Sequence, residues 1–299
     1  MRDSFDCVII GDGVAGLSAA LVLGRARRKT LVLGAGEPRN APARKMHGFF
    51  SREGTNPKEL LVIARSQIAL YSDVSIENRH VVDLKGSIGH FVAHTAVGET
   101  FHSTRILLAT GVRDVLPKVE GVHELWGTRL FTCPYCDGWE FCDRRIAVVG
   151  PGCEAIGLAR ELFRWSEDLI VCVTDPSEPA AEDRTWFERH KPRVVSGEIA
   201  RFSEAGSAVR IDLKDGTHVE CDVVFLSAPL RQRSTLPVAL GCKLEEDGRI
   251  AIDDCGRTNV PGVYAAGDAA NRRHQVVLAA AGGAAAAMTI NEDCIEAER

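Results

Sequence analysis

Two cysteines and an acid lie together in the segment TCPYCDGWEF, residues 132–141. Cys133 and Cys136 are separated by two residues, and Asp137 follows directly. A C-x-x-C pair can bind a metal, form a redox-active disulfide, or consist of two inert thiols. A zinc site needs two further ligands, and the nearby Cys142 and Cys153 form no second pair. We therefore expect no metal site, and the redox interpretation depends on what surrounds the cysteines.

A glycine motif near the N-terminus is the first element that could position such chemistry. Gly11, Gly13 and Gly16 form G-x-G-x-x-G between an apolar run (7–10) and a helical stretch (17–27). The first glycine permits a tight turn, the second admits a pyrophosphate, and the third allows close packing of helix on strand. The motif predicts a β-α-β dinucleotide-binding unit.

The second strand of this unit, expected over 30–33, ends without the acid that usually binds a ribose hydroxyl. That position reads Gly34-Ala35-Gly36, and Glu37 follows. We expect that Glu37 or a backbone group makes the ribose contact, or that the contact is weaker.

The pattern recurs further along the chain. A strand at 146–149 leads into G-x-G-x-x-A at 150–155, then a helix and another strand. Two such openings, about 140 residues apart, predict an α/β fold of two nested Rossmann-like domains. We expect one dinucleotide-binding domain from residues 1–115 and 236–299, and a smaller Rossmann-like domain from residues 116–235 that carries the CPYC motif.

Two further segments sharpen this expectation. RILLATGV (105–112) is typical of a buried strand that ends in Ala-Thr-Gly. TNVPGVYAAGDAA (258–270) predicts a turn and a strand before Gly267-Asp268, where an acid can hydrogen-bond a sugar-like chain. The following HQVVLAAAGG starts a predicted helix whose N-terminus could face an anion.

These motifs, in this order, resemble the low-molecular-weight thioredoxin reductases, together with their dithiol-oxidase and NADPH-independent relatives. The likeness covers nearly the whole chain and implies FAD as cofactor and a homodimer. The positions that we expect at FAD, from the motifs and the resemblance, are Gly11, Gly13, Gly16, Glu37, Arg39, Asn40, His47, Val82, Ala109, Thr110, Gly111, Asp268, Gln275 and Val276.

Individual roles follow from the resemblance. Val82 would lie near the adenine, Asp268 would bind the ribitol chain, and Gln275 with Val276 would lie at the pyrimidine end of the flavin. His47, in KMHGFF, is expected either to handle protons beside the dithiol or simply to pack.

The resemblance also implies different roles for the two cysteines and for Asp137. Cys136 would be the thiol facing the flavin, Cys133 the thiol that meets the substrate, and Asp137 the acid or base at the thiol. A thiolate at the start of a helix would be stabilised by the helix dipole and free amides.

The electron donor is the main departure from NADPH-dependent enzymes, which carry a histidine and arginines after the second strand of the second unit. Here the segment 171–184 has acids and prolines, and Pro151 removes one amide from the phosphate loop. We therefore expect no use of NADPH. The donor would then be NADH or a ferredoxin-type protein, or the second nucleotide site would be vestigial. The residues concerned are Asp175, Pro176, Glu178, Pro179, Glu182 and Asp183.

Three functions remain open on these grounds. The first passes electrons through Cys133 and Cys136 to a protein disulfide such as that of thioredoxin. The second oxidises a small-molecule dithiol with O₂ as acceptor. The third, a non-catalytic flavin-binding sensor, is disfavoured because it has no need of the two cysteines and Asp137 together.

The composition of the 299 residues sets outer limits. Hydrophobic residues make up 45% and charged residues 26%, as in ordinary globular proteins. The net charge of -5 argues against nucleic-acid binding, and no apolar run is long enough to span a membrane. The ten cysteines are scattered, which favours a cytoplasmic protein with reduced thiols.

Overall fold

The computed structural model describes residues 4–175 and 181–299. The chain forms two compact units. We call the unit made of the chain up to Ala41, Gly48–Arg113 and Leu230–Arg299 the first unit. The middle unit consists of Pro42–His47 and Asp114–Pro229. Among the described residues, no helix has both the length and the apolar character needed to cross a membrane.

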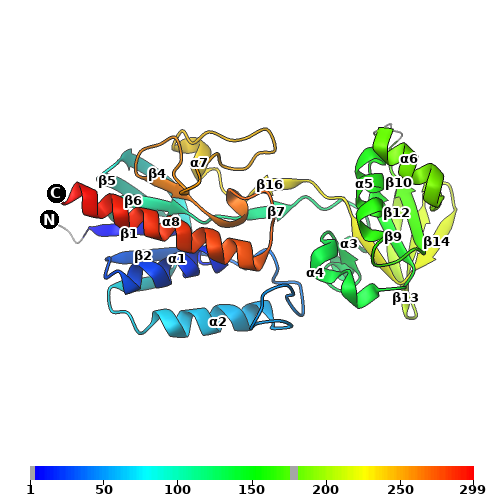
Figure 1. The fold of residues 1–299 in the computed structure, drawn as a ribbon, viewed down its shortest axis with the longest axis horizontal. Coiled ribbons are helices and arrows are strands. Elements are labelled where there is room, and N and C mark those ends of the chain that lie inside the picture. Colours follow the sequence, from blue (N-terminus) through cyan, green and yellow to red (C-terminus); the bar gives the residue numbers. More distant parts are fainter. Residues whose placement is uncertain (1–3, 176–180) are drawn as a thin grey trace. The chain divides into compact units, whose positions relative to one another are not determined.

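The first unit is built on a mixed sheet with the strand order β3-β2-β1-β6-β5-β4, to which β17 adds beside β6 (Figure 1). Strands β3, β2, β1, β6 and β17 run parallel, whereas β4 and β5 pair antiparallel. The strands are β1 (Phe5–Ile10), β2 (Thr30–Gly34), β3 (Val74–Asn78), β4 (Val81–Ser87), β5 (His90–Thr95), β6 (Thr100–Leu108) and β17 (Val263–Ala265).

Both faces of this sheet are covered, which explains why its central strands are apolar throughout. Cys7 and Ile9 of β1 point toward the helices, while Val8 and Ile10 point to the opposite core. Burying each valine or isoleucine contributes about 1.5–3 kcal/mol. The helices are α1 (Val14–Arg25), α2 (Pro57–Ile68), the short α7 (Leu236–Ala239) and α8 (Val276–Ala297), with a 3₁₀ turn, η2, at Gly267–Ala269.

The close packing of α8 on α1 depends on small residues. The two helices lie side by side on one face of the sheet (Figure 1). A Cβ on Gly283 would collide with the backbone of Ala15, and the Ser18 hydroxyl donates to the carbonyl of Ala280 at 2.7 Å. The alanine-rich tail thus brings the strand-end loop after β17 next to the start of α1.

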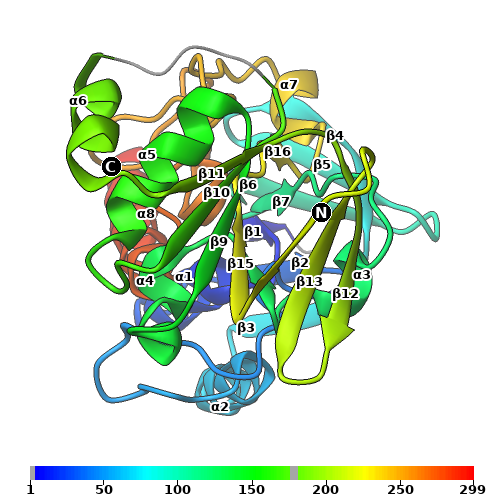
Figure 2. The same cartoon turned by 90° about the vertical axis from the view of Figure 1, so that its right-hand side faces the viewer.

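The middle unit has a second parallel sheet with the order β11-β10-β9-β15-β8. One face packs on α5 and α6, and the other on the antiparallel sheet β12-β13-β14 (Figure 2). The strands are β8 (Leu130–Phe131), β9 (Ile146–Gly150), β10 (Leu169–Val173), β11 (Arg193–Ser196), β12 (Ile199–Ala205), β13 (Ala208–Leu213), β14 (His218–Cys221) and β15 (Val223–Leu226).

The helices of the middle unit include the segment that carries the cysteine pair. They are α3 (Val122–Leu125), α4 (Pro134–Asp137), the 3₁₀ turn η1 (Trp139–Phe141), α5 (Gly152–Leu162) and α6 (Ala181–His190). A short ribbon of β7 (Val112–Asp114) and β16 (Leu230–Gln232) joins the two passages of the chain between the units.

The fold class expected from the sequence, α/β with two Rossmann-like units, is confirmed. Most strand ends shift by one or two residues, and two boundaries differ by more. The first helix begins at Val14 and ends at Arg25, because Arg27 adopts a positive φ of 59° that a helix does not allow. The expected strand at 105–112 ends at Leu108, so that Ala-Thr-Gly forms the turn after the strand.

Candidate flavin and dithiol sites

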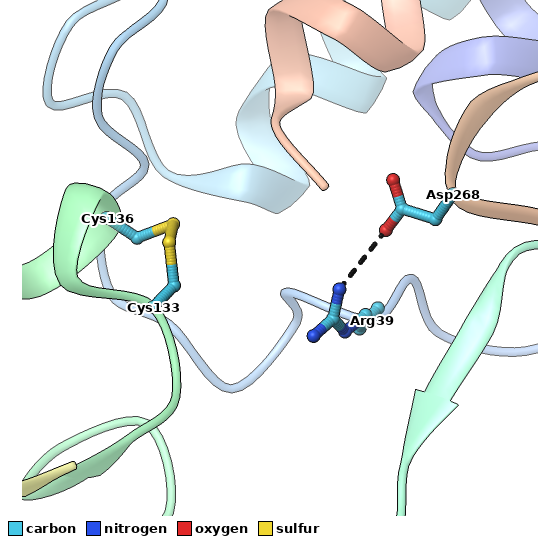
Figure 3. The surroundings of a disulfide bond; sticks show 4 residues. All are labelled: Arg39, Cys133, Cys136 and Asp268. Atoms are coloured by element: carbon cyan, nitrogen blue, oxygen red, sulfur yellow. Dashed lines mark hydrogen bonds and ion pairs between the residues drawn. A yellow bond between two sulfur atoms is a disulfide. The ribbon is translucent and has the colours of Figure 1, made fainter. Parts of the chain in front are cut away.

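Cys133 and Cys136 form a disulfide in the middle unit, with their Cα atoms 5.3 Å apart (Figure 3). Cys133 is the N-cap of α4, and the Cys136 amide donates to the Cys133 carbonyl at 3.2 Å. Pro134 at the first helical position starts the turn because its φ is preset for a helix. The single turn brings the two sulfur atoms together.

The acid beside the disulfide has unusual proton affinity. Burial raises the pKa of Asp137 from 3.8 to about 7; the Glu140 carboxylate adds to this rise, and His47 opposes it. His47 Nε2 lies 3.3 Å from Glu140 Oε1. Asp137 can therefore both donate and accept a proton near neutral pH, as a general acid or base must.

The helix that begins at the cysteine pair is a single turn. The helix α4 has only four residues, so its dipole is small and contributes little to a thiolate. The expected stabilisation by a helix dipole is therefore weak here.

Two exposed aromatic residues lie next to the disulfide in the sequence of the middle unit. Tyr135, between the two cysteines, is 67% exposed and makes an edge contact with Trp165 at 5.5 Å between ring centroids. Trp139 is 77% exposed. Two large exposed aromatics so close to a redox disulfide are suited to contact with another molecule.

The glycine loop of the first unit has the features of a pyrophosphate site. Gly13 is the N-cap of α1 and supplies no side-chain cap, so the first amides of the helix stay available to an anion. A Cβ at Gly13 would meet no atom within 4 Å, whereas one at Gly16 would strike the Gly11 carbonyl. The loop is therefore open at Gly13, where a ligand must approach, and closed at Gly16, where the helix packs.

Gly11 and the Ala-Thr-Gly turn approach each other closely. Gly11 has a φ of +115°, and a Cβ there would collide with the carbonyl of Ala109. The buried hydroxyl of Thr110 has no hydrogen-bond partner in the described chain. Gly111 has a φ of +66° and open space at its Cβ position. A buried hydroxyl without a hydrogen bond is energetically costly. Its position beside an open loop therefore fits a bound polar cofactor.

Three of the polar residues expected at FAD, Arg39, Asp268 and Gln275, belong to the first unit. Arg39 Nη1 lies 3.4 Å from Asp268 Oδ2, and both side chains are about one-fifth exposed (Figure 3). Asp268 belongs to the 3₁₀ turn η2, and Gln275 is the N-cap of α8, with its Oε1 3.6 Å from a Cβ built on Gly48. These polar side chains, together with the open glycine loop, therefore fit FAD.

The remaining expected residues are more peripheral. The Glu37 side chain is 70% exposed and pairs with Lys58 at 2.9 Å, and its carbonyl accepts from Arg233 at 2.5 Å. Val82, on β4, is 53% exposed. Asn40 is half-buried in a turn, and Val276 is the half-buried first residue of α8.

The second glycine loop, in the middle unit, is less favourable to phosphate. Pro151 is the N-cap of α5, and Glu154 stands in the first turn of that helix. The Ser227 hydroxyl donates to Glu154 Oε2 at 2.6 Å. An acid here competes with any anion for the helix N-terminus. Asp175 is exposed; Pro176, Glu178 and Pro179 lie outside the described residues.

Sequence reasoning missed Glu140 and the pair Asp12 and Arg65. Glu140 is three residues beyond Asp137, a spacing that suggests proximity on a helical turn. Arg65 donates to Asp12 from α2, a contact between distant segments that no local motif reveals. The other cysteines form no disulfide among the described residues: Cys7, Cys172, Cys221, Cys242 and Cys294 are buried, Cys142 is half-buried, and Cys153 and Cys255 are exposed.

A flavoprotein disulfide oxidoreductase is the class that this fold and these sites define. Residues 5–284 match the model of the pyridine nucleotide-disulphide oxidoreductase family. The chain therefore belongs to that family, and its thioredoxin reductase-like members are FAD-binding enzymes.

Individual relatives support the same conclusion. The chain is 31% identical to a protein of Arthroderma benhamiae named "Probable thioredoxin reductase", over 89% of this chain and 74% of the relative. It is also 31% identical to thioredoxin reductase tcpT of Claviceps purpurea, over 88% and 86%. The crystal structure of an oxidoreductase from Agrobacterium tumefaciens superposes with a TM-score of 0.92 and 34% identity, over 98% and 99%. The chain is thus a thioredoxin reductase-like disulfide oxidoreductase.

Proposed function

We propose that this protein moves electrons between FAD, the Cys133–Cys136 disulfide and the disulfide of a thioredoxin-like protein, without NADPH as donor. The observation that carries the proposal is the disulfide followed directly by Asp137, whose pKa is raised to about 7. A proton-transfer group at the sulfur atoms is what repeated opening and closing of this bond requires.

The thiol–disulfide exchange begins when the Cys133–Cys136 bond opens. Bound FAD, once reduced by the electron donor, would supply the electron pair, and two protons complete the dithiol. The Cys133 thiolate then attacks the partner disulfide, and one partner sulfur leaves as thiolate. Cys136 attacks Cys133 in the mixed disulfide, which restores the intramolecular bond and releases the partner as a dithiol. Asp137 gives and takes back the proton at the thiol.

We assign FAD to the first unit and the dithiol to the middle unit. Gly11, Gly13 and Gly16 would hold the pyrophosphate, and the Ala109–Gly111 turn would lie along the cofactor. Arg39 and Asp268 would contact its sugar-like chain, and Gln275 and Val276 its flavin end. Asn40 would border the same site, Val82 would lie near the adenine, and His47 would act from the middle unit on the proton transfers at the dithiol.

The second glycine loop supports the exclusion of NADPH. Pro151 removes one amide donor, and Glu154 places negative charge in the first turn of α5. Glu182 and Asp183, in the first turn of α6, both pair with Arg160, so this cation is already engaged rather than open to a 2′-phosphate. NADH, or a ferredoxin-type protein, is the donor class compatible with them.

A second candidate runs in the opposite direction. The exposed aromatics Tyr135 and Trp139 favour contact with an apolar small molecule as well as with a protein. In this case a small-molecule dithiol loses two electrons and two protons to the Cys133–Cys136 disulfide and closes its own disulfide. The electron pair then passes through FAD to O₂, and hydrogen peroxide forms.

An anaerobic titration of the flavin absorbance band tests these alternatives. We expect no bleaching by NADPH, and either NADH or a reduced ferredoxin should bleach the band if the enzyme is a reductase. Bleaching by NADPH at micromolar concentrations would contradict the exclusion. Reduction by a dithiol alone, followed by peroxide release on admission of air, would establish the oxidase. Cys133→Ser should abolish dithiol-driven reduction, with Cys255→Ser as the matched control on an exposed, unpaired cysteine.

We also propose that the protein is a homodimer, as the family resemblance implies. Size-exclusion chromatography with light scattering should give twice the chain mass of 32.4 kDa, and a monomeric mass at micromolar concentration would exclude the dimer.

A further inference from the structure

The strand β2 of the first unit lacks the acid that a dinucleotide-binding unit usually places at its end. In such units an Asp or Glu about 20 residues after the glycine loop hydrogen-bonds a ribose hydroxyl. Here β2 ends at Gly34, which has no side chain. The next acid, Glu37, is 70% exposed and already paired with Lys58. Another group must therefore supply the contact.

The side chain of Asp12 occupies the place that Gly34 leaves open. A Cβ built on Gly34 would collide with the Cβ, Cγ and Oδ1 atoms of Asp12. The Asp12 carboxyl group thus lies where a side chain at the end of β2 would begin. Asp12 belongs to the glycine loop itself, between Gly11 and Gly13. A residue larger than glycine at position 34 would force this carboxylate to move.

A cation from the neighbouring helix fixes the orientation of this carboxylate. Arg65 Nη2, on α2, donates to Asp12 Oδ2. Asp12 is 23% exposed and Arg65 39% exposed, so the pair is partly shielded from water. The other oxygen, Oδ1, lies over Gly34 and has lone pairs for a hydroxyl donor. Arg65 also offsets negative charge that would otherwise repel a pyrophosphate at the loop.

We propose that Asp12 is the carboxylate that binds the adenosine ribose of FAD, an acid moved from the end of β2 into the glycine loop. The proposal rests on the binding of FAD at this loop. Gly34 is then required for its lack of a side chain, and Glu37 has no part in ribose recognition. The two positions exchange roles: an acid at one demands a small residue at the other.

The affinity of the apoprotein for FAD, measured by quenching of flavin fluorescence, tests this exchange of roles between positions 12 and 34. Asp12→Gly should weaken FAD binding about 10- to 100-fold, because a charge-assisted hydrogen bond to the ribose is lost. The isosteric Asp12→Asn should weaken it about 10-fold while preserving the shape of the loop. Glu37→Gln is the matched control and should change the dissociation constant less than about twofold.

The decisive variants involve Gly34. Gly34→Asp alone should weaken binding, since two carboxylates then compete for one place. The double variant Asp12→Gly/Gly34→Asp should recover an affinity within about threefold of the original protein. A double variant as weak as Asp12→Gly, or a loss with Glu37→Gln but not with Asp12→Asn, would overturn the proposal. Because the readout is FAD affinity, failure here is separate from failure of the thiol–disulfide function, which the donor titration decides.

Discussion

The Nε2 atom of His47 lies 3.3 Å from the Oε1 atom of Glu140, and both residues act on the same acid, Asp137. Burial is the largest cause of the rise in the pKa of Asp137, and Glu140 and His47 shift it in opposite directions. The loop that follows the PRN segment thus contributes to the proton affinity of the group next to Cys136. In the proposed function this would link proton transfer to disulfide exchange within the middle unit.

Replacing Asp137 should slow turnover and change its pH dependence. The acid has a pKa of about 7, so its protonated form declines as the pH rises through 7. A step that needs this proton slows above pH 7 in the original protein. We expect Asp137→Asn to lower kcat about 10- to 100-fold and to remove the decline in rate above pH 7, which is the alkaline limb of the pH profile. Rates of reduction of a small aromatic disulfide between pH 5.5 and 8.5 measure it. An unchanged limb in the variant would assign the titration to another group.

The two neighbours of Asp137 should shift the same limb in opposite directions. Glu140 raises the pKa of Asp137, so Glu140→Gln should move the limb to lower pH. His47 lowers that pKa, so His47→Gln should move the limb to higher pH. The same rate profiles report both shifts. A change in rate without a shift would mean that these side chains act through packing rather than through charge.

The stability of the protein should also depend on the protonation of Asp137. Its pKa is 3.8 in the unfolded chain and about 7 in the folded one, so the folded state binds more protons between these values. The contribution of protonated Asp137 to the free energy of unfolding is therefore fully present below about pH 4. This contribution, ~1–4 kcal/mol, is lost as the pH rises toward 7. Urea midpoints of the FAD-saturated protein, compared at pH 5 and 8, should differ less in Asp137→Asn. An equal difference in both proteins would contradict the burial of this acid.

The redox pair should be indispensable and the other exposed cysteines dispensable. Cys133→Ser and Cys136→Ser should each lower disulfide turnover more than about 1,000-fold, because neither alone can close the intramolecular bond. Cys153→Ser and Cys255→Ser, at exposed positions outside the disulfide, should keep turnover within about twofold. Activity that survives in Cys133→Ser would indicate a different thiol at the substrate.

The glycine loops and the C-x-x-C could be predicted from the sequence because their chemistry depends on local spacing. Gly11, Gly13 and Gly16 each meet the local requirement that the motif implies, and the structure places a strand before them and a helix after them. The identity of the family followed from the order of such motifs. Strand ends were predicted less well, since the apolar run at 105–112 continues past the last ladder bond at Leu108.

Contacts between distant segments were beyond the reach of the sequence. The pairing of Arg65 with Asp12, and of His47 with Glu140, depends on how helices and loops pack in three dimensions. A pKa raised by burial likewise needs the folded surroundings, because the sequence around Asp137 contains no sign of desolvation. The missing acid at Gly34 was visible in the sequence, but its replacement in space was not.

The exposed tryptophan beside the disulfide should distinguish a protein substrate from a small reagent. Trp139 is 77% exposed and lies three residues from Cys136. Large aromatics at the centre of an interface carry much of the binding energy. We expect Trp139→Ala to raise KM for a thioredoxin-like protein about 10-fold, with kcat unchanged and the rate with a small aromatic disulfide unaffected. Val194→Ala, at a 45% exposed apolar position of the same unit, is the control. If the variant instead loses a small dithiol substrate and leaves the protein substrate untouched, Trp139 serves the oxidase reaction, and the thioredoxin-like partner docks elsewhere.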